Sequence, residues 1–128
     1  MSDLDRPDLP APPVKALLAF FDATDEWDGS PLHEELVRQL QRHGIAGATV
    51  LSGIMGYGIH RRIHRKGLFG VVDNKPVTLV AIDNEEKLRQ TLPFIRHMIR
   101  EGIVVLVDAE LIPVSTGSAP QAGGVEPD

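Results

Sequence analysis

The order of four apolar, strand-length runs and two helical stripes limits the fold of this chain more than any other feature. The runs occupy residues 15–21, 48–59, 76–82 and 103–112. In the two longer gaps, apolar residues recur every three or four positions, which indicates an amphipathic helix in each. The order strand, helix, strand, strand, helix, strand is typical of a ferredoxin-like βαββαβ arrangement. We therefore predict an α+β fold: a four-stranded antiparallel sheet with both helices on one face.

The first helix is predicted over residues 31–43. Ser30 is expected to be its N-cap, with Pro31 at the first helical position, and Gly44 is expected to end it. Its buried stripe would consist of Leu32, Leu36, Val37 and Leu40.

The second helix is expected to start with a capping box formed by Asp83 and Glu86 and to end before Gly102. Its stripe would consist of Leu88, Leu92, Ile95 and Ile99. Pro93 lies inside that pattern and should kink or divide the helix. Pro76 opens the preceding strand, which favours a start at a sheet edge.

One domain is expected over residues 14–112, because 128 residues is a one-domain length. The flanking segments 1–13 and 113–128 are acidic and rich in small residues and proline, which predicts disordered tails. No cysteine is present, which excludes disulfides and thiolate catalysis. The sequence has neither a membrane-length apolar run nor a signal-peptide pattern, so a cytoplasmic protein is expected. An open apolar sheet face would favour self-association.

Positive charge is concentrated in the middle of a chain whose net charge is -5. No acidic residue occurs between residues 36 and 72. The cations of that stretch are Arg38, Arg42, Arg61, Arg62, Arg65 and Lys66. Such a local excess attracts anions whatever the whole-chain charge. A nucleic-acid partner is not expected, since there is one basic cluster, few aromatic residues and two acidic tails.

The glycines Gly53, Gly56 and Gly58 come directly before the densest cations, at residues 60–66. Glycine lets a ligand approach bare backbone, and successive amides can form an anion-binding nest. Arginine adds the forked donors that phosphate geometry favours. The combination predicts an anion site of the phosphate type. The alternatives are a bulged strand for the glycines and a solvated loop for the cations.

Other candidate groups form weaker patterns. His60 and His64 are four residues apart, but this segment is not expected to be helical, so no metal site is predicted. The acidic loop at residues 22–28 is more simply a solvated turn beside a helix N-terminus than a cation site. Trp27 within that loop is a packing residue, an interface anchor or a ligand platform. No nucleophile is paired with a base, so an enzyme is not expected.

Several strings in the sequence resemble a bacterial and archaeal family. They are S-P-L-H-E-E-L-V at residues 30–37, G-I-A-G-A-T-V-L-S-G-I-M-G-Y-G-I at 44–59, I-H at 63–64 and P-V at 76–77. These strings are similar to the domain-of-unknown-function family one hundred and ninety, often labelled PII-like. The resemblance extends over roughly residues 14–112.

The resemblance implies a trimer whose connection after the second strand is a mobile T-loop. In PII proteins the base of that loop helps to bind adenine nucleotides between subunits. By matching position, Gly53, Gly56 and Gly58 would line the base, while His60, Arg62 and His64 would reach toward phosphate or effector. An effector of this kind is not a resident cofactor, and none is expected. Relatives near fluoride-exit channels imply a transporter or channel as partner.

This chain departs from the family pattern at three places. Asp22-Ala23-Thr24 replaces a Gly-Glu-Ser/Asp-like string, Asn74 and Lys75 precede Pro76 in place of Asp-Leu, and Arg61 and Arg65 make the loop more basic. The basic pair that PII proteins carry before the last strand is not evident at residues 102–104.

We therefore expect a regulator that binds a small anionic effector. Two alternatives remain open at this point. One is a protein–protein interaction module without a small ligand. The other is a small enzyme that uses His60 or His64 as a general acid or base.

Overall fold

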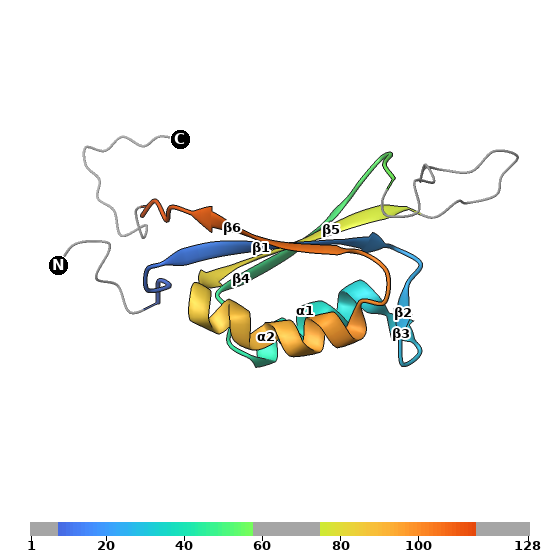
Figure 1. Ribbon diagram of the computed structural model, residues 1–128, viewed down its shortest axis with the longest axis horizontal. Helices are drawn as coiled ribbons and strands as arrows, with labels where there is room; N and C mark the ends of the chain where they lie inside the picture. The colour runs from blue at the N-terminus through green and yellow to red at the C-terminus, as the bar shows by residue number, and fades with distance from the viewer. Residues whose placement is uncertain (1–7, 58–74, 115–128) are drawn as a thin grey trace, which may run out of the picture.

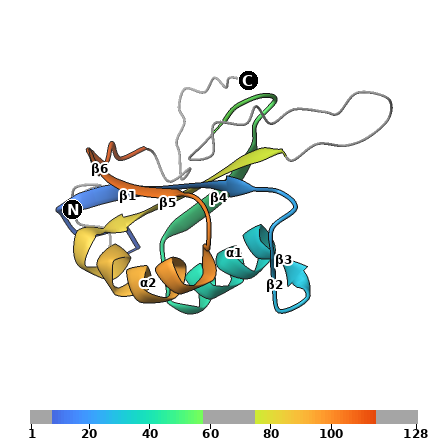
Figure 2. The ribbon, with the colours of Figure 1, turned by 45° about the vertical axis from the view of Figure 1, so that its right-hand side comes forward.

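The computed structural model describes residues 8–57 and 75–114. Its main sheet has four strands, β1 (Val14–Asp22), β4 (Gly47–Ser52), β5 (Pro76–Asn84) and β6 (Ile103–Ala109). The strand order is β4-β5-β1-β6, and every neighbouring pair is antiparallel. The helices α1 (Leu32–Arg42) and α2 (Glu85–Met98) both lie beneath one face of this sheet (Figures 1 and 2). The predicted α+β, ferredoxin-like fold is confirmed.

Alternation along the strands divides their side chains between two faces. Leu17 lies opposite Ala81 on β5 and Leu106 on β6, and all three face the helices. Leu17, Leu79, Leu36, Leu40, Leu88 and Ile95 are fully buried in the resulting core. The helical stripes predicted from spacing therefore supply the second layer of the core.

The start of α1 differs from the sequence prediction. Ser30 and Pro31 form β3 (Ser30–Pro31), which pairs with β2 (Glu26–Trp27) in a small hairpin. Pro31 is consequently the N-cap, and no side chain caps the helix. The Leu32 amide instead donates to the carbonyl of Asp25 at 2.8 Å. Ser30 is not the cap because its backbone is committed to the hairpin. The predicted stop is confirmed, since Gly44 has a φ of +73°.

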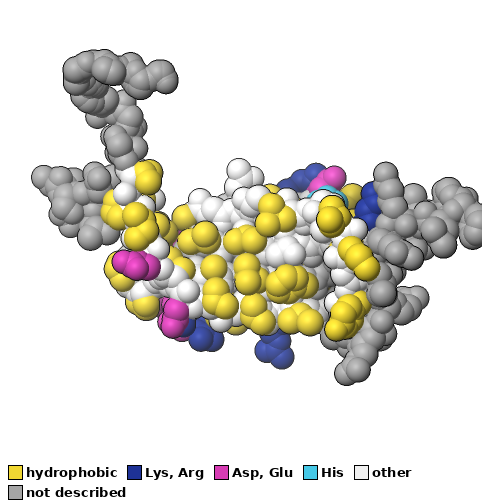
Figure 3. All heavy atoms as spheres, turned by 90° about the horizontal axis from the view of Figure 1, so that it is seen from above, with side chains coloured by type: hydrophobic (Ala, Val, Ile, Leu, Met, Phe, Trp, Pro, Cys, Tyr) yellow, Lys and Arg dark blue, Asp and Glu magenta, His cyan; other side chains and the backbone are white. Residues whose placement is uncertain are grey.

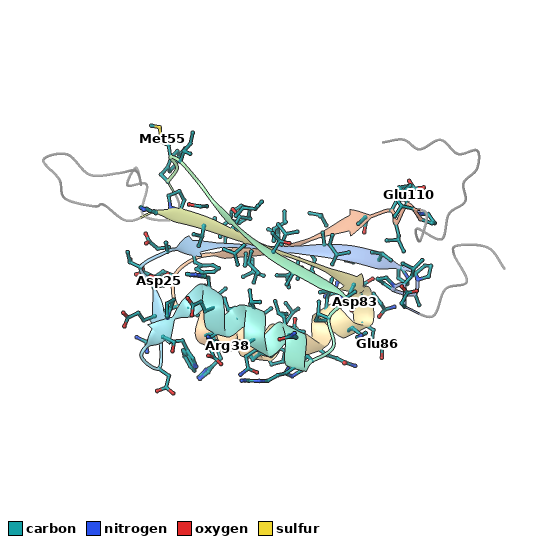
Figure 4. All side chains as sticks on the ribbon, turned by 180° about the vertical axis from the view of Figure 1, so that it is seen from behind. Asp25, Arg38, Met55, Asp83, Glu86 and Glu110 are labelled. Carbon is teal, nitrogen blue, oxygen red and sulfur yellow. The ribbon has the colours of Figure 1, made fainter. Side chains whose placement is uncertain are left out.

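The start of α2 is one residue later than predicted. Asn84 is the N-cap, and its side chain accepts the Lys87 amide at 3.1 Å. Asp83 is buried, and its Oδ2 accepts the Ala46 amide at 2.8 Å and lies 3.3 Å from the Lys87 ammonium. The predicted Asp83–Glu86 capping box is therefore wrong, because Asp83 ties the loop after α1 to the start of α2. Asp83 and Glu86 are both labelled in Figure 4.

The structure also bears on the two proline predictions. Pro93 lies inside a single helix from Glu85 to Met98, so of the two predicted alternatives the division of the helix is wrong. Pro76 opens β5, which is an inner strand between β4 and β1. A first strand residue needs no amide donor, and the Pro76 carbonyl accepts the Gly53 amide at 2.8 Å.

The ends of the described chain lie at the opposite end of the sheet from residues 53–57 (Figure 1). The carbonyls of Ala11 and Pro13 accept the Asn84 side-chain amide and the Glu85 backbone amide. The remainder of the predicted tails, residues 1–7 and 115–128, lies outside the described residues. Among the helices that the structure describes, none has the length and apolar character needed to cross a membrane.

Candidate functional site

The two ends of the cation-rich segment are held together at one end of the sheet. The Gly53 amide donates to the Pro76 carbonyl at 2.8 Å, just beyond the last paired residues of β4 and β5. On the other side of β5, the Ala23 amide donates to the Lys75 carbonyl at 2.8 Å. Residues 53 and 75, on either side of the cation-rich segment, are therefore held at the ends of β4, β5 and β1, which we call the root.

Gly53 is required at this root for steric reasons. A Cβ built on Gly53 would lie 2.9 Å from Cγ and 3.2 Å from the carbonyl oxygen of Pro76. The proline ring is rigid, so a side chain at residue 53 would push the two strands apart. Gly56 is less constrained, since its Cβ would lie 3.6 Å from the same ring, which is ordinary contact. The sequence predicts a role for both glycines, and in the structure only Gly53 is too close to Pro76 for a side chain.

Asp22 organises the acidic side of the root. Its Oδ1 accepts the Thr24 amide at 2.9 Å and the Thr24 hydroxyl at 2.8 Å, and it also accepts the Lys75 amide at 3.3 Å. Asp25 Oδ2 in turn accepts the Asp22 amide at 3.2 Å. These hydrogen bonds fix the turn after β1 against the residue that precedes β5. The acidic segment is therefore an ordered part of the root as well as a turn beside a helix. The Asp-x-Thr spacing, which favours an Asx turn, was the available sequence signal.

The predicted site residues are only partly within the described chain. Gly53 and Gly56 lie at the root. Gly58, His60, Arg62 and His64 lie outside the described residues. Arg38 and Arg42, which contribute to the basic stretch in sequence, belong to α1 and pair with Glu34 and Glu35. With Arg38 and Arg42 paired, the rest of the basic excess lies in residues 61–66, outside the described residues.

An open cavity of about 360 Å³ lies near the root, on the helix side of the sheet. Its lining consists of Thr24, Asp25, Glu26, Leu32, Met98, Arg100 and Glu101. Carboxylates outnumber the single arginine there, which disfavours a phosphate ligand. In the ranges 8–57 and 75–114, no cluster of three or more potential metal ligands was found.

Trp27 is a packing residue. It lies half-buried against the core, and its ring meets His97 edge-on with centroids 5.3 Å apart. The packing interpretation of this residue is supported.

The second feature of interest is the open face, the face of the sheet opposite the helices, whose three central rows contain no charged residue. Registered neighbours place three rows of side chains on it. The rows are Leu51–Thr78–Phe20–Ile103, Thr49–Val80–Leu18–Val105 and Gly47–Ile82–Ala16–Val107. Apolar side chains fill the centre of this face in Figure 3, and charged side chains lie at its margins. Six of its large side chains are 36–53% exposed, whereas Leu18 and Val80 at its centre are half-buried; the six are Phe20, Leu51, Ile82, Ile103, Val105 and Val107.

Comparison with known proteins places the chain in a family. The model of the DUF190 family, "Uncharacterized ACR, COG1993", matches residues 14–111. A UPF0166 protein of Aquifex aeolicus is 35% identical over 99 residues, which are 77% of this chain and 93% of that protein.

Solved structures share the fold at lower identity. CPII, a nitrogen regulatory PII-like protein from Thiomonas intermedia K12 bound to ADP, AMP and bicarbonate, has a TM-score of 0.56 and 22% identity, covering 77% of this chain and 87% of that one. CutA of Pyrococcus horikoshii has a TM-score of 0.53 and 15% identity, covering 77% and 86%. At such identities the likeness concerns the fold. The family match and the Aquifex relative go further, and the chain belongs to the DUF190 family.

Proposed function

We propose that this protein is a PII-like regulator and not an enzyme. It binds a small anionic effector, an adenine nucleotide, at the base of the cation-rich segment. The bound effector changes the surface that this segment presents to a partner, such as a membrane transporter or channel. For that switch to operate, the effector must bind one state of the segment more tightly than the other.

The geometry of the root is the observation that carries this proposal. Hydrogen bonds from Gly53 to Pro76 and from Ala23 to Lys75 fix both ends of a segment that contains four permanent cations in seven residues. A rigid root restricts where those cations can go, which reduces the entropy lost when they gather around an anion. Arginine forks and exposed backbone amides are suited to phosphate oxygens.

The comparisons add support at the level of the fold. CPII shares this fold and was solved with ADP and AMP. Nucleotide binding is thus compatible with this architecture, and the basic residues of this chain supply the charge that a nucleotide requires.

We further propose that the protein is a homotrimer built on the open face. Twelve uncharged positions on that face, most of them apolar, have no cover from the protein's own helices. Burying a large aliphatic side chain contributes about 1.5–3 kcal/mol, so covering this face with other copies would stabilise an assembly.

The test is isothermal titration calorimetry with a panel of adenine nucleotides, inorganic phosphate and bicarbonate. We expect Arg62→Ala to weaken the tightest ligand about tenfold to hundredfold, the effect of losing one charge-assisted hydrogen bond. Arg89→Ala is the matched control, because Arg89 pairs with Glu85 on the outer surface of α2. Unchanged affinity in Arg62→Ala, or an equal loss in both variants, would refute the proposed site.

The same panel distinguishes the proposed regulator from the alternative, a protein–protein interaction module without a small ligand. That alternative predicts no binding to any compound in the panel. It also predicts a partner complex, isolated by pull-down, that survives removal of all nucleotides.

A further inference from the structure

The cavity near the root, which we call the root cavity, combines both signs of charge with an apolar floor. Its volume of about 360 Å³ lies within the roughly 300–1,000 Å³ that is usual for small-ligand sites. Leu32 and Met98 form the floor and are almost completely buried. Three carboxylates and one guanidinium also line the cavity, a formal balance of -2; they belong to Asp25, Glu26, Glu101 and Arg100. This lining suits a ligand that is partly apolar and carries a net positive charge.

The backbone on both sides of the root cavity is fixed by contacts with the rest of the fold. Asp25 lies between the end of the sheet and the start of α1 (Figure 4), where its carbonyl accepts the Leu32 amide at 2.8 Å. On the other side, Gly102 approaches the Phe20 carbonyl so closely that a Cβ would not fit between them. The charged side chains therefore project from ordered backbone, which lowers the entropy lost when they bind a ligand.

Two opposite charges line the root cavity without pairing with each other. Within residues 8–57 and 75–114, no hydrogen bond or ion pair engages the side chain of Glu26 or that of Arg100. Each side chain therefore keeps its full capacity to bind a ligand. A guanidinium binds a carboxylate through two parallel hydrogen bonds, and a carboxylate accepts from an ammonium group. A zwitterion satisfies both charges at once, and the excess of carboxylates leaves room for a second cation.

We propose that the root cavity binds a free basic amino acid of the lysine and arginine class. The α-carboxylate pairs with Arg100, the α-ammonium and the side-chain cation pair with the carboxylates, and the methylene groups lie on the apolar floor. This inference goes beyond the proposed function, because it adds a second ligand of opposite charge. The cavity also shares a turn with the root, since Asp25 accepts the Asp22 amide and Asp22 accepts the Lys75 amide.

An NMR titration of the full-length, 15N-labelled protein tests the proposed ligand. The compounds are L-lysine, cadaverine, which lacks the carboxylate, and L-norleucine, which lacks the side-chain cation. We expect lysine to shift the amide signals of residues 24–26 and 98–102. Lysine should bind about threefold to tenfold more tightly than either comparison compound, the effect of one partly exposed charged contact.

Two variants assign the charged contacts. Arg100→Gln should remove the preference for lysine over cadaverine, because the carboxylate then has no cationic partner. Arg96→Gln is its control, since Arg96 is exposed one turn earlier and does not line the cavity. Glu26→Gln should weaken lysine and cadaverine alike, by about threefold or more. Glu86→Gln, at an exposed position in the first turn of α2, should change neither affinity.

Three results would overturn the inference. They are the absence of shifts at residues 24–26 and 98–102 in lysine up to about 10 mM, equal affinities for lysine and norleucine, and an unchanged lysine preference in Arg100→Gln. The nucleotide titrations are separate measurements, so the two proposals can fail independently. A protein that binds lysine but no nucleotide supports the root cavity and refutes the proposed effector, and the opposite result does the reverse.

Discussion

Both faces of the sheet have largely apolar central rows, but within the described part of the chain helices cover only one of them. Leu17 and Leu18 are neighbours on β1, and each lies between partners on β5 and β6. Leu17 faces the helices and is fully buried, whereas Leu18 faces outward among side chains that are up to half exposed. The helices therefore cover one face, and the homotrimer that we propose would cover the other.

This difference assigns separate tasks to the two faces. The covered face, with α1 and α2, gives the subunit its stability. The open face is the surface on which we propose that the subunits assemble. The root, which contains Gly53 and Lys75, lies where β4 ends and β5 begins.

A charge on the open face should have the largest effect. We expect Val105→Glu to dissociate the assembly, because burial of an unpaired carboxylate costs about several kcal/mol in every copy. Light scattering after size exclusion would report a monomer, while far-UV circular dichroism would keep its native shape. Gln90→Glu adds the same charge to the outer surface of α2 and should leave the mass unchanged. An intact oligomer in Val105→Glu would show that the open face is not the interface.

The second largest effect is expected from a cavity in the core beneath the covered face. Leu17→Ala should lower the free energy of unfolding by about 2–5 kcal/mol, the cost of deleting a fully buried leucine. Leu18→Ala should cost clearly less when urea unfolding is measured at low protein concentration. If the two variants lose the same stability, the subunit does not have one covered and one open face.

Substitution at the root should have an intermediate effect. Gly53→Ala should cost about 1–3 kcal/mol, because the new methyl group meets the rigid Pro76 ring. Gly56→Ala is the matched comparison, where a Cβ makes ordinary contact, so a change of less than about 1 kcal/mol is expected. Thermal unfolding of the two variants measures the difference, and equal melting temperatures would contradict it.

The ion pair at the rim should have the smallest effect. A hydrogen bond from Lys15 lowers the pKa of Asp108, and the same bond raises the pKa of Lys15. The contribution of Asp108 is therefore present above the ordinary carboxyl pKa and is lost as the pH falls through its lowered value. Asp108→Asn should lower the urea midpoint slightly at pH near 7 and have no effect in strong acid. Glu110→Gln, after the end of β6, should change the midpoint at neither pH, and a shift as large as that of Asp108→Asn would contradict a specific pair.

Periodicity was sufficient to predict the layers of the fold. The spacing of Leu32, Leu36 and Leu40 placed them on one face of a helix, and all three are buried. Element starts were predicted less well, because they depend on distant partners. The Asp83 carboxylate accepts the Ala46 amide, 37 residues away in the sequence, and Asn84 is the N-cap of α2. Ser30 and Pro31 pair with Trp27 and Glu26 in the short hairpin, so α1 starts after them.

The candidate site shows the same limit. Composition indicated the glycines and the cations, and the resemblance placed them at the base of a loop. Asp22 was interpreted as part of a solvated turn, since nothing local reveals its bond to the Lys75 amide, 53 residues away. The exposure of Ile54 could not be predicted either, because it depends on where the chain leaves the sheet.

Native mass spectrometry of the purified, untreated protein tests the central claim most directly. The measurement reports the number of subunits and the mass of any small molecule that copurifies. Our account predicts a trimer in which added or copurified adenine nucleotide binds to the assembled protein. A monomer that binds no nucleotide at any concentration tested would contradict it.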